Sequence, residues 1–348
     1  MPEPEVSLII PTRNRWSALA RTLRALADQT VLGRFEVIVA DDGSDQPQPA
    51  DLSGADWPMP VRLLSLEHVG IGPAKNRAIA EARGRLMIFI NDDTCPEPDF
   101  VEQHLAARAD ARGHDWMHLG LTRWRDWPDA NLFDRLIAES GMIFFYHNLQ
   151  PQGLYNFRHA WNCNLSVDAE AVRDAGAFNE QLGPFFFEDL ELAFRLEQRG
   201  WQVRYWPEAV TTHDHRYTPD AYLRREHLLG RMAVWLWRAN PQCFEAVYSA
   251  PLDREYVAYC RRFVSDQQHE AERMAERFRS WDRLPADVLT SWPTGGSALV
   301  ELLVAAHRLL KRWTFRCGLV EEADRSGELD RRDRPQPVRR LKLDAVNA

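Results

Sequence analysis

Residues 86–93 read Leu-Met-Ile-Phe-Ile-Asn-Asp-Asp, an apolar run that ends in two adjacent carboxylates, Asp92 and Asp93. The run is typical of a buried β-strand. In open α/β sheets, ligands bind outside the carboxyl ends of the parallel strands, which is where these carboxylates would lie. Paired oxygen ligands there suit Mg²⁺ or Mn²⁺ held against a diphosphate. A solvated loop after a strand is the alternative interpretation of the segment taken by itself.

The first hundred residues alternate between strand and helix signals. Apolar runs at 6–10, 35–40, 61–66 and 86–90 predict strands, and the spacing of apolar residues predicts helices at 16–26 and 73–82. Single helices between strands indicate βαβ units and a mostly parallel sheet. Because polar side chains follow three of these strands, we expect a ligand crevice at the rim of the sheet. These side chains are Thr12, Asn14, Asp41, Asp42, Asn91, Asp92 and Asp93.

Composition and charge narrow the class of protein. The 348 residues suffice for one large or two smaller domains, and 45% hydrophobic with 27% charged residues is ordinary for a soluble globular protein. A net charge of −8 does not suggest a nucleic-acid partner. The five cysteines are scattered without a Cys-x-x-Cys pair, which favours a reducing, cytoplasmic setting over a zinc site or a disulfide framework. We expect neither a secretory signal nor a membrane-spanning segment.

The remaining chain divides into a mixed region and a helical region. Strands are predicted at 116–121, 160–167 and 203–206, with a turn opening at Pro207, and a helix is predicted at 188–199. From Thr218 onward the pattern is helical, and 325–348 reads as a flexible charged tail. The basic side chains near this end are compatible with peripheral contact with the inner face of an anionic membrane, although a solvated basic face is favoured. They are Arg308, Lys311, Arg312, Arg316, Arg339, Arg340 and Lys342.

Two loops have residue types suited to a nucleotide. Asp41 and Asp42 follow the second strand, where a carboxylate can accept hydrogen bonds from a nucleobase or a ribose, although Asp-Asp-Gly-Ser is also turn chemistry. Residues 70–77, Gly-Ile-Gly-Pro-Ala-Lys-Asn-Arg, place two glycines and a cation at a predicted helix start, which favours phosphate. This is neither a Walker loop nor the dinucleotide fingerprint.

Two further segments offer catalytic or metal-ligating groups. Glu188 and Asp189 open a helix after three phenylalanines, so they are either first-turn acids favoured by the helix dipole or a base with a raised pKa. His213 and His215 flank Asp214 beyond a β-branched run, and a histidine in this position is either structural or a metal ligand.

These segments, in this order, resemble the family 2 glycosyltransferases, which have the GT-A fold. The resemblance extends from Val6 to His215, and the collinear succession of motifs carries it. The matching segments are 7–15 (SLIIPTRNR), 39–44 (VADDGS), 74–78 (AKNRA), 89–93 (FINDD), 164–166 (NLS), 176–180 (GAFNE) and 188–196 (EDLELAFRL).

The resemblance implies inverting transfer of a sugar from a nucleoside-diphosphate sugar to the hydroxyl of a saccharide or other acceptor, assisted by Mn²⁺ or Mg²⁺. It implies an α/β GT-A fold, Rossmann-like, with a mostly parallel central sheet flanked by helices and a helical C-terminal extension. Asp189 would be the general base and Glu188 its neighbour, while Asp93 and His213 would bind the metal. The nucleotide would be bound by Pro11, Thr12, Asn14, Asp41, Asp42, Lys75, Asn76 and Asp92.

The chain departs from the family pattern at three points. Asn91 stands where the family often has Asp, which removes one carboxylate from the metal site. Lys75 stands where Arg is frequent, and lysine lacks the bidentate geometry of arginine. His213 and His215 compete for the role of metal ligand, and the donor base, the sugar and the acceptor stay open.

We expect a GT-A domain at 1–217, with a nucleotide-sugar half at about 1–115 and an acceptor half at about 116–217. A helical region at 218–324 and the tail at 325–348 would follow. The alternatives are a nucleotidyltransferase, which has no evident need for the acids at 188 and 189, and an inactive nucleotide-sugar-binding scaffold. Nucleoside diphosphate release that depends on Asp189 would separate the transferase from both.

Overall fold

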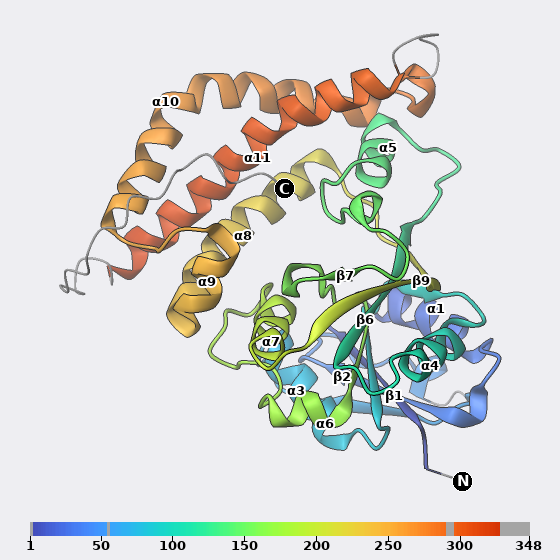
Figure 1. Ribbon diagram of the computed structural model, residues 1–348. Coiled ribbons are helices and arrows are strands. Elements are labelled where there is room, and N and C mark those ends of the chain that lie inside the picture. Colours follow the sequence, from blue (N-terminus) through green and yellow to red (C-terminus); the bar gives the residue numbers. More distant parts are fainter. Residues whose placement is uncertain (1–2, 54–55, 290–295, 328–348) are drawn as a thin grey trace. The chain divides into compact units, whose positions relative to one another are not determined.

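The computed structural model describes residues 3–53, 56–289 and 296–327 (Figure 1). The chain forms two compact units. The first comprises Met1–Arg125, Tyr146–Glu180 and Glu188–His215, and the second comprises Asp126–Phe145, Gln181–Phe187 and Arg216–Ala348. The second unit thus begins its long segment next to the boundary expected after residue 217, and it also takes two segments from within the expected first domain.

The first unit is built on a sheet of nine strands among the described residues, in the order β3-β2-β1-β4-β8-β6-β9-β5, with β7 paired to β9. Neighbours in the group β3-β2-β1-β4 are all parallel, as the alternation of strands and helices predicted. The strands are β1(Val6–Thr12), β2(Phe35–Asp41), β3(Val61–Ser65), β4(Leu86–Ile90), β5(Thr94–Pro96), β6(Trp116–Trp124), β7(Leu154–Tyr155), β8(Asn164–Asp168) and β9(Gln202–His213).

The second half of this sheet is mixed. Strand β8 is antiparallel to both β4 and β6, β5 and β7 are antiparallel to β9, and only the β6–β9 pair is parallel. The expectation of a mostly parallel sheet therefore holds for the first four strands and not for the remainder, because β8 enters the centre of the sheet in the opposite direction. The α/β class with helices flanking a central sheet is confirmed.

Helices cover both faces of the parallel strands (Figure 1). Leu8 on β1, Val37 on β2 and Ile88 on β4 pack in one apolar core with α1(Trp16–Ala27) and α4(Phe100–Asp110). On the opposite face, α3(Ile71–Glu81) contacts β1 and β2, and Phe89 meets the Phe178 ring edge-on at 5.4 Å between centroids. Burial on both faces explains why these strands are continuous apolar runs without alternation. The unit also contains α2(Ala50–Ser53), α6(Ala169–Asp174), α7(Glu188–Glu197), and the 3-10 helices η1(Leu32–Arg34), η2(Tyr146–Asn148) and η3(Phe157–His159).

Strand β9 does not end at the turn predicted at Pro207. It runs to His213, and its register with β6 shifts so that Gly120 pairs with Trp206 while Leu121 pairs with Val210. Three residues are thus looped out, and Pro207 is tolerated there because a bulge needs no ladder hydrogen bond from its nitrogen. The Asn164 side chain fixes the bulge by donating hydrogen bonds to the Leu121 oxygen at 3.1 Å and the Ala209 oxygen at 2.8 Å. This bulge sets where His213 falls at the end of the strand.

The second unit is helical. Two of its helices, α8 and α11, meet at two glycines, since a Cβ on Gly230 would lie 1.9 Å from the Phe315 carbonyl oxygen and one on Gly318 would lie 1.9 Å from the His227 carbonyl oxygen. No described helix is long and apolar enough to cross a membrane. The helices are α5(Leu132–Glu139), α8(Pro219–Ala239), α9(Pro241–Tyr248), α10(Arg254–Arg279), α11(Gly296–Ser326) and the 3-10 helices η4(Ser280–Arg283) and η5(Ala286–Leu289).

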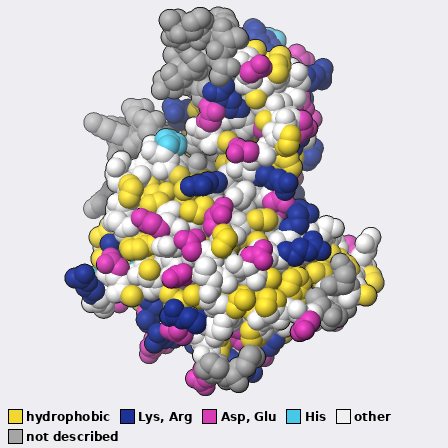
Figure 2. Space-filling view, turned by 90° about the vertical axis from the view of Figure 1, so that its right-hand side faces the viewer, with side chains coloured by type: hydrophobic (Ala, Val, Ile, Leu, Met, Phe, Trp, Pro, Cys, Tyr) yellow, Lys and Arg dark blue, Asp and Glu magenta, His cyan; other side chains and the backbone are white. Residues whose placement is uncertain are grey.

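The basic residues near the C-terminal end are partly engaged within the second unit. The Lys311 ammonium donates to the Met142 carbonyl oxygen at 2.9 Å, and the Arg316 guanidinium lies 4.6 Å from the centroid of the Phe263 ring. On the face shown in Figure 2, Lys and Arg side chains are interspersed with Asp and Glu. The expected tail begins inside α11, where Arg325 pairs with Glu322, and its residues 328–348 lie outside the described residues.

Candidate active site

Asp92 lies directly beyond β4 and is buried, with 4% of its surface exposed. Its carboxylate accepts a hydrogen bond from the Thr12 hydroxyl at 2.8 Å, and its backbone oxygen accepts one from the Thr22 hydroxyl at 2.8 Å. Burial, together with the negative charge of Asp93, raises the pKa of Asp92 to about 7, although Arg15 and Thr12 act against the increase. Thr12 and Asp92, both predicted from the ends of neighbouring strands, therefore do meet.

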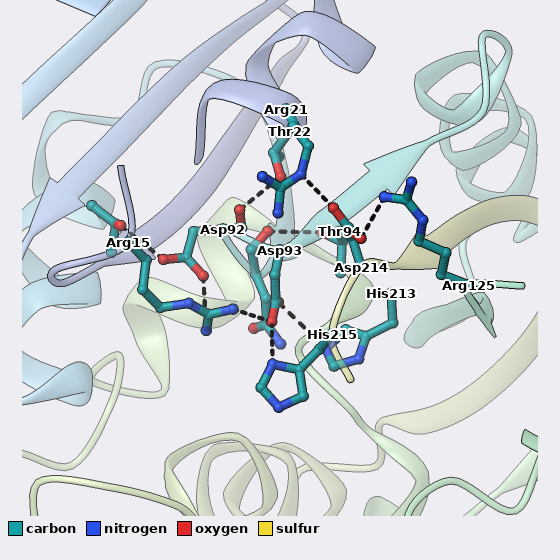
Figure 3. A network of polar contacts seen from close by, with 12 residues as sticks. Arg15, Arg21, Thr22, Asp92, Asp93, Thr94, Arg125, His213, Asp214 and His215 are labelled. Atoms are coloured by element: carbon teal, nitrogen blue, oxygen red, sulfur yellow. Dashed lines mark hydrogen bonds and ion pairs between the residues drawn. The ribbon is translucent and has the colours of Figure 1, made fainter. Parts of the chain in front are cut away.

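Asp93 is surrounded by cationic and imidazole nitrogens (Figure 3). Its carboxylate lies 3.3 Å from His213 Nε2 and 3.4 Å from His215 Nδ1, and it is paired with the Arg15 guanidinium, which also lies 3.2 Å from Asp92. Burial opposes ionisation of Asp93, but His213, His215 and Arg15 outweigh it and hold the pKa of the carboxyl well below its usual range. Both histidines named as alternatives therefore face the same carboxylate.

The donor set around Asp93 fits a divalent cation that is shared with a ligand. Asp93 Oδ1 is buried and makes no hydrogen bond within the described residues, although His213 Nε2 points toward it. In the described part of the chain, no three or more His, Cys, Asp or Glu side chains are arranged to hold a metal ion by themselves. One carboxylate and one or two imidazoles leave most positions of an octahedral ion open, and diphosphate oxygens and water can fill them. Arg15 currently places a positive charge against both carboxylates.

The segment that carries both histidines is anchored by Asp214, a residue to which the sequence analysis gave no role. The buried Asp214 carboxylate pairs with Arg21 on α1 and with Arg125 Nη1 at 2.7 Å (Figure 3). Its backbone nitrogen donates to the Asp93 oxygen at 2.7 Å. Asp214 thereby joins the ends of β4 and β9, and its place between two candidate ligands is the sequence signal that could have revealed it.

The loops after β1 and β2 are tied together by their own polar groups. Asn14, in the left-handed region with φ of 57°, donates to Asp45 at 2.8 Å and accepts from the Asp45 nitrogen at 2.8 Å. Its backbone nitrogen donates to the Ser44 hydroxyl at 2.8 Å, and Asp41 accepts from the Ser44 nitrogen at 3.1 Å. Pro11 is buried within β1, opposite Ala40. The structure thus brings the predicted residues Pro11, Asn14 and Asp41 to one rim.

Asp42 and Asn76 are committed to the protein itself. The Asp42 carboxylate accepts hydrogen bonds from the Val69 nitrogen at 2.7 Å and the Gly70 nitrogen at 3.0 Å, which fixes the loop before α3. The Asn76 amide donates to the Phe178 oxygen at 2.9 Å and accepts from the Phe178 nitrogen at 2.9 Å. In the structure their polar groups hold two loops of the first unit in place, and their expected role in nucleotide binding stays a prediction.

Lys75, which was expected to lie near the nucleotide, is buried against the start of α7. Its side chain is 1% exposed, and its ammonium lies 2.8 Å from Glu188 Oε1. Gly70, just before α3, adopts a φ of 98°, and a Cβ at Gly72 would lie at an ordinary contact distance of 3.9 Å from Glu188 Cβ, so α3 and α7 pack closely here. The Lys75 ammonium on α3 is therefore directed at the start of α7.

Glu188 and Asp189 occupy the first turn of α7, as predicted. Glu188 is buried against Lys75, whereas Asp189 is partly exposed and accepts hydrogen bonds from the Leu190 nitrogen at 2.7 Å and the Asn162 nitrogen at 3.4 Å. Desolvation raises the pKa of Asp189 to about 6, with a further increase from Glu188 and an opposing effect of Lys75. A carboxylate with this pKa is ionised, and so able to accept a proton, near neutral pH.

A buried thiol connects the two acidic pairs. Burial raises the pKa of Cys163 to about 12, and the negative charges of Asp189 and Asp93 both add to the increase. The Cys163 side chain also lies 3.5 Å from the Thr122 hydroxyl on β6. The α7 acids and the strand-end acids therefore share one region of the first unit.

Family models identify the class that this arrangement defines. A mixed α/β sheet with carboxylates and histidines at its strand ends and acids at a facing helix start is the architecture of a GT-A glycosyltransferase. The model described as glycosyl transferase family 2 matches residues 7–162, and that described as glycosyl transferase family group 2 matches residues 86–265. The chain belongs to the family 2 glycosyltransferases.

Similar proteins agree with this family. The chain is 28% identical over 224 residues to validoxylamine A glucosyltransferase of Streptomyces hygroscopicus subsp. jinggangensis, covering 57% of this chain and 52% of the relative. It is 26% identical over 249 residues to pre-mycofactocin glycosyltransferase of Mycobacterium tuberculosis, covering 68% of this chain and 48% of the relative. The chain thus spans about half the length of these curated relatives.

The fold is shared with a solved structure, the mannosyltransferase PcManGT from Pyrobaculum calidifontis in complex with GDP-Man and Mn²⁺. The TM-score is 0.54 at 18% sequence identity, and the match covers 95% of this chain and 88% of that one. At this identity the likeness establishes the GT-A fold.

Proposed function

We propose that the chain transfers a sugar from a nucleoside-diphosphate sugar to an acceptor hydroxyl, with inversion at the anomeric carbon. The observation that carries the proposal is the pairing of two acidic sites in one unit. At the ends of β4 and β9, Asp93 faces two imidazoles and lies beside Asp92, while Asp189 at the start of α7 has a pKa raised to about 6. Family membership supports the reaction class.

The strand-end site is suited to the diphosphate of the donor. Asp93 and His213 would hold a divalent cation, with His215 as the alternative imidazole. The Asp92 carboxylate lies 3.2 Å from the Arg15 guanidinium, which also pairs with Asp93. A bound cation supplies Lewis-acid stabilisation of the charge that develops on the leaving diphosphate. The buried hydrogen bonds of Thr12 and Asp214 fix the two carboxylate-bearing strands, so these ligands need little reorganisation when the donor binds.

The α7 site is suited to the acceptor. Asp189 would accept the proton of the attacking hydroxyl, which then displaces the nucleoside diphosphate from the opposite face of the sugar in a single step. Glu188 is held by Lys75 and cannot take this role without breaking a buried pair. The two sites would have separate roles, because the strand-end site would bind the leaving group and the α7 site would activate the nucleophile.

The first test is thermal unfolding with UDP, GDP, dTDP and CDP, each with Mn²⁺, Mg²⁺ or EDTA. A ligand at 100 times its dissociation constant adds about 2.7 kcal/mol to the free energy of unfolding. We expect one nucleotide to raise the melting temperature in the presence of metal, and Asp93→Ala to abolish the metal-dependent part. Asp189→Asn is the matched control, because it should retain the full nucleotide shift.

The second measurement separates the transferase from a binding scaffold. The nucleotide-sugar of the base identified above is incubated with water as the acceptor, and release of the nucleoside diphosphate and the anomeric configuration of the free sugar are followed by NMR. We expect release that is lost in Asp189→Asn, and an inverted first product. No shift with any nucleotide, or release that is unchanged in Asp189→Asn, contradicts the proposal.

A further inference from the structure

Lys75 is a buried cation that the reaction proposed above does not use directly. It is 1% exposed on α3, its ammonium lies 2.8 Å from Glu188 Oε1, and the Phe178 ring centroid lies 5.1 Å from the same nitrogen. Glu188 is itself 6% exposed. The ion pair is therefore enclosed by apolar groups and little screened by water.

Stability alone gives a poor reason for this pair. Desolvating two charges costs several kcal/mol per ion, and apolar residues of similar volume often replace a buried ion pair without loss. The pair is, however, placed next to Asp189, whose carboxylate is fixed by the Leu190 and Asn162 nitrogens. Without the Lys75 ammonium, the adjacent carboxylates of Glu188 and Asp189 would repel each other at the start of α7 with no positive charge from α3 to offset them.

We propose that Lys75 is a positioning residue, whose buried ammonium holds the Glu188 carboxylate and supplies the positive charge that lets the adjacent Asp189 act as a base near neutral pH. The role rests on the proposed function, because Asp189 must be the base for Lys75 to matter to the reaction. Lys75 touches Glu188 and Phe178 and acts on the reaction through them.

The charge balance around Asp189 supports this role. Glu188 raises the pKa of Asp189 and Lys75 lowers it, with burial as the largest single influence. The Cys163 thiol is held neutral by burial, since its pKa is raised to about 12. The other charged groups on α7 and on elements in contact with it are Glu191, Arg195 and Glu197 on α7, Arg77 and Glu81 on α3, Arg158 and His159 on η3, and Glu170, Arg173 and Asp174 on α6.

The test measures the pKa of Asp189 itself. Protein labelled with ¹³C-aspartate is titrated by NMR, and the Asp189 carboxyl signal is assigned by its loss in Asp189→Asn. Because loss of a nearby positive charge disfavours the ionised carboxylate, we expect Lys75→Met to raise the Asp189 pKa. Lys75→Arg keeps the charge and should leave the pKa near its wild-type value.

Two further variants keep the test decisive if Lys75→Met does not fold. Glu188→Gln should lower the Asp189 pKa, and the neutral pair in Lys75→Met/Glu188→Gln should bring it back upward. Equal values in Glu188→Gln and the double variant would overturn the proposal, as would an unchanged pKa in folded Lys75→Met. Lys311→Met is a matched control, because Lys311 faces Glu226 at 3.9 Å within the second unit and should leave Asp189 unchanged.

A direct readout of the lysine is also available. The chain has only three lysines, Lys75, Lys311 and Lys342, so ¹⁵N-lysine labelling gives a spectrum that substitutions assign at once. The Lys75 nitrogen signal should shift in Glu188→Gln, which removes the charge of its partner. Turnover by Asp189→Asn would refute the base and hence the proposed function, whereas a dead Asp189→Asn with an Asp189 pKa insensitive to Lys75 would refute the present inference alone.

Discussion

Two of the pairs of adjacent acids in the first unit, at 92–93 and 188–189, are matched to a cation in different ways. Asp92 and Asp93 at the end of β4 share Arg15, whose side chain is 41% exposed. Glu188 at the start of α7 is paired with Lys75, whose side chain is 1% exposed. In each pair one acid has a raised pKa, about 7 for Asp92 and about 6 for Asp189.

The difference in exposure indicates which cation can be exchanged. An exposed guanidinium exchanges its partners for water at little cost, so Arg15 can leave Asp93 when a metal and a diphosphate arrive. A buried ammonium has no such alternative, so the charge of Lys75 is a fixed part of the α7 site. On the proposed function, the strand-end pair would exchange Arg15 for a ligand, whereas in the α7 pair Glu188 would keep Lys75 as its partner.

The largest expected effect comes from removing the base while the ligand site stays intact. Because general base catalysis contributes roughly 10²–10⁴-fold, Asp189→Asn should reduce nucleoside diphosphate release by about that factor. Asp93→Asn should instead weaken metal-dependent nucleotide binding. Initial rates and calorimetric titrations of both variants give the comparison, and equal losses of binding in the two would show that the acidic pairs do not have separate roles.

The next effect concerns stability and compares the two cations directly. Breaking a buried ion pair by removing one partner costs about 3–5 kcal/mol. Water screens the exposed Arg15 guanidinium, which weakens its pairs with the buried Asp92 and Asp93. Lys75→Met should therefore lower the free energy of unfolding by several kcal/mol more than Arg15→Ala does. Urea unfolding of the two variants measures the difference, and equal losses would show that burial does not distinguish the cations.

Much of this comparison could be predicted from the sequence, because it depends on local patterns. The apolar runs located the first four strands, and β4 spans residues 86–90 as expected. The acids at 92, 93, 188 and 189 were found because each lies next to an element boundary that the apolar pattern marks. The succession of motifs then identified the family, which the family models confirm.

The remainder depends on contacts between distant segments, which no local pattern encodes. Lys75 is separated from Glu188 by 113 positions, and Arg21 from Asp214 by 193. Lys75 was assigned to the nucleotide because a cation after glycines favours phosphate in isolation, and the approach of α7 redirects it. The continuation of β9 past Pro207 was missed because the bulge that accommodates the proline is held by Asn164 on another strand.

A smaller effect links the base to stability. The folded-state pKa of Asp189, about 6, exceeds its ordinary value of 3.8, so folding favours the protonated form. The contribution of Asp189 to the free energy of unfolding is therefore lost as the pH rises from about 4 to about 6. The uncharged side chain in Asp189→Asn should restore this stability above that range. Since Asp189 is partly exposed, we expect Asp189→Asn to gain on the order of 1 kcal/mol at pH 7.5 and little at pH 4. Melting temperatures at both pH values test this. A lower melting temperature of Asp189→Asn than of the wild type at pH 7.5 would show that folding does not disfavour the charged form of Asp189.

The smallest effect tests whether Arg15 competes with the metal. The guanidinium neutralises Asp92 and Asp93 in the structure, and a divalent cation at Asp93 must displace it. Because an exposed pair contributes at most about 1 kcal/mol, Arg15→Ala should tighten Mn²⁺ binding in the absence of nucleotide by up to about fivefold. The free Mn²⁺ signal in electron paramagnetic resonance measures this without turnover, and Arg13→Ala, on the same loop, is the matched control. Weaker Mn²⁺ binding in Arg15→Ala would mean that Arg15 orders Asp92 and Asp93 for the metal. Arg15 would then be a fixed part of the strand-end site, as Lys75 is of the α7 site.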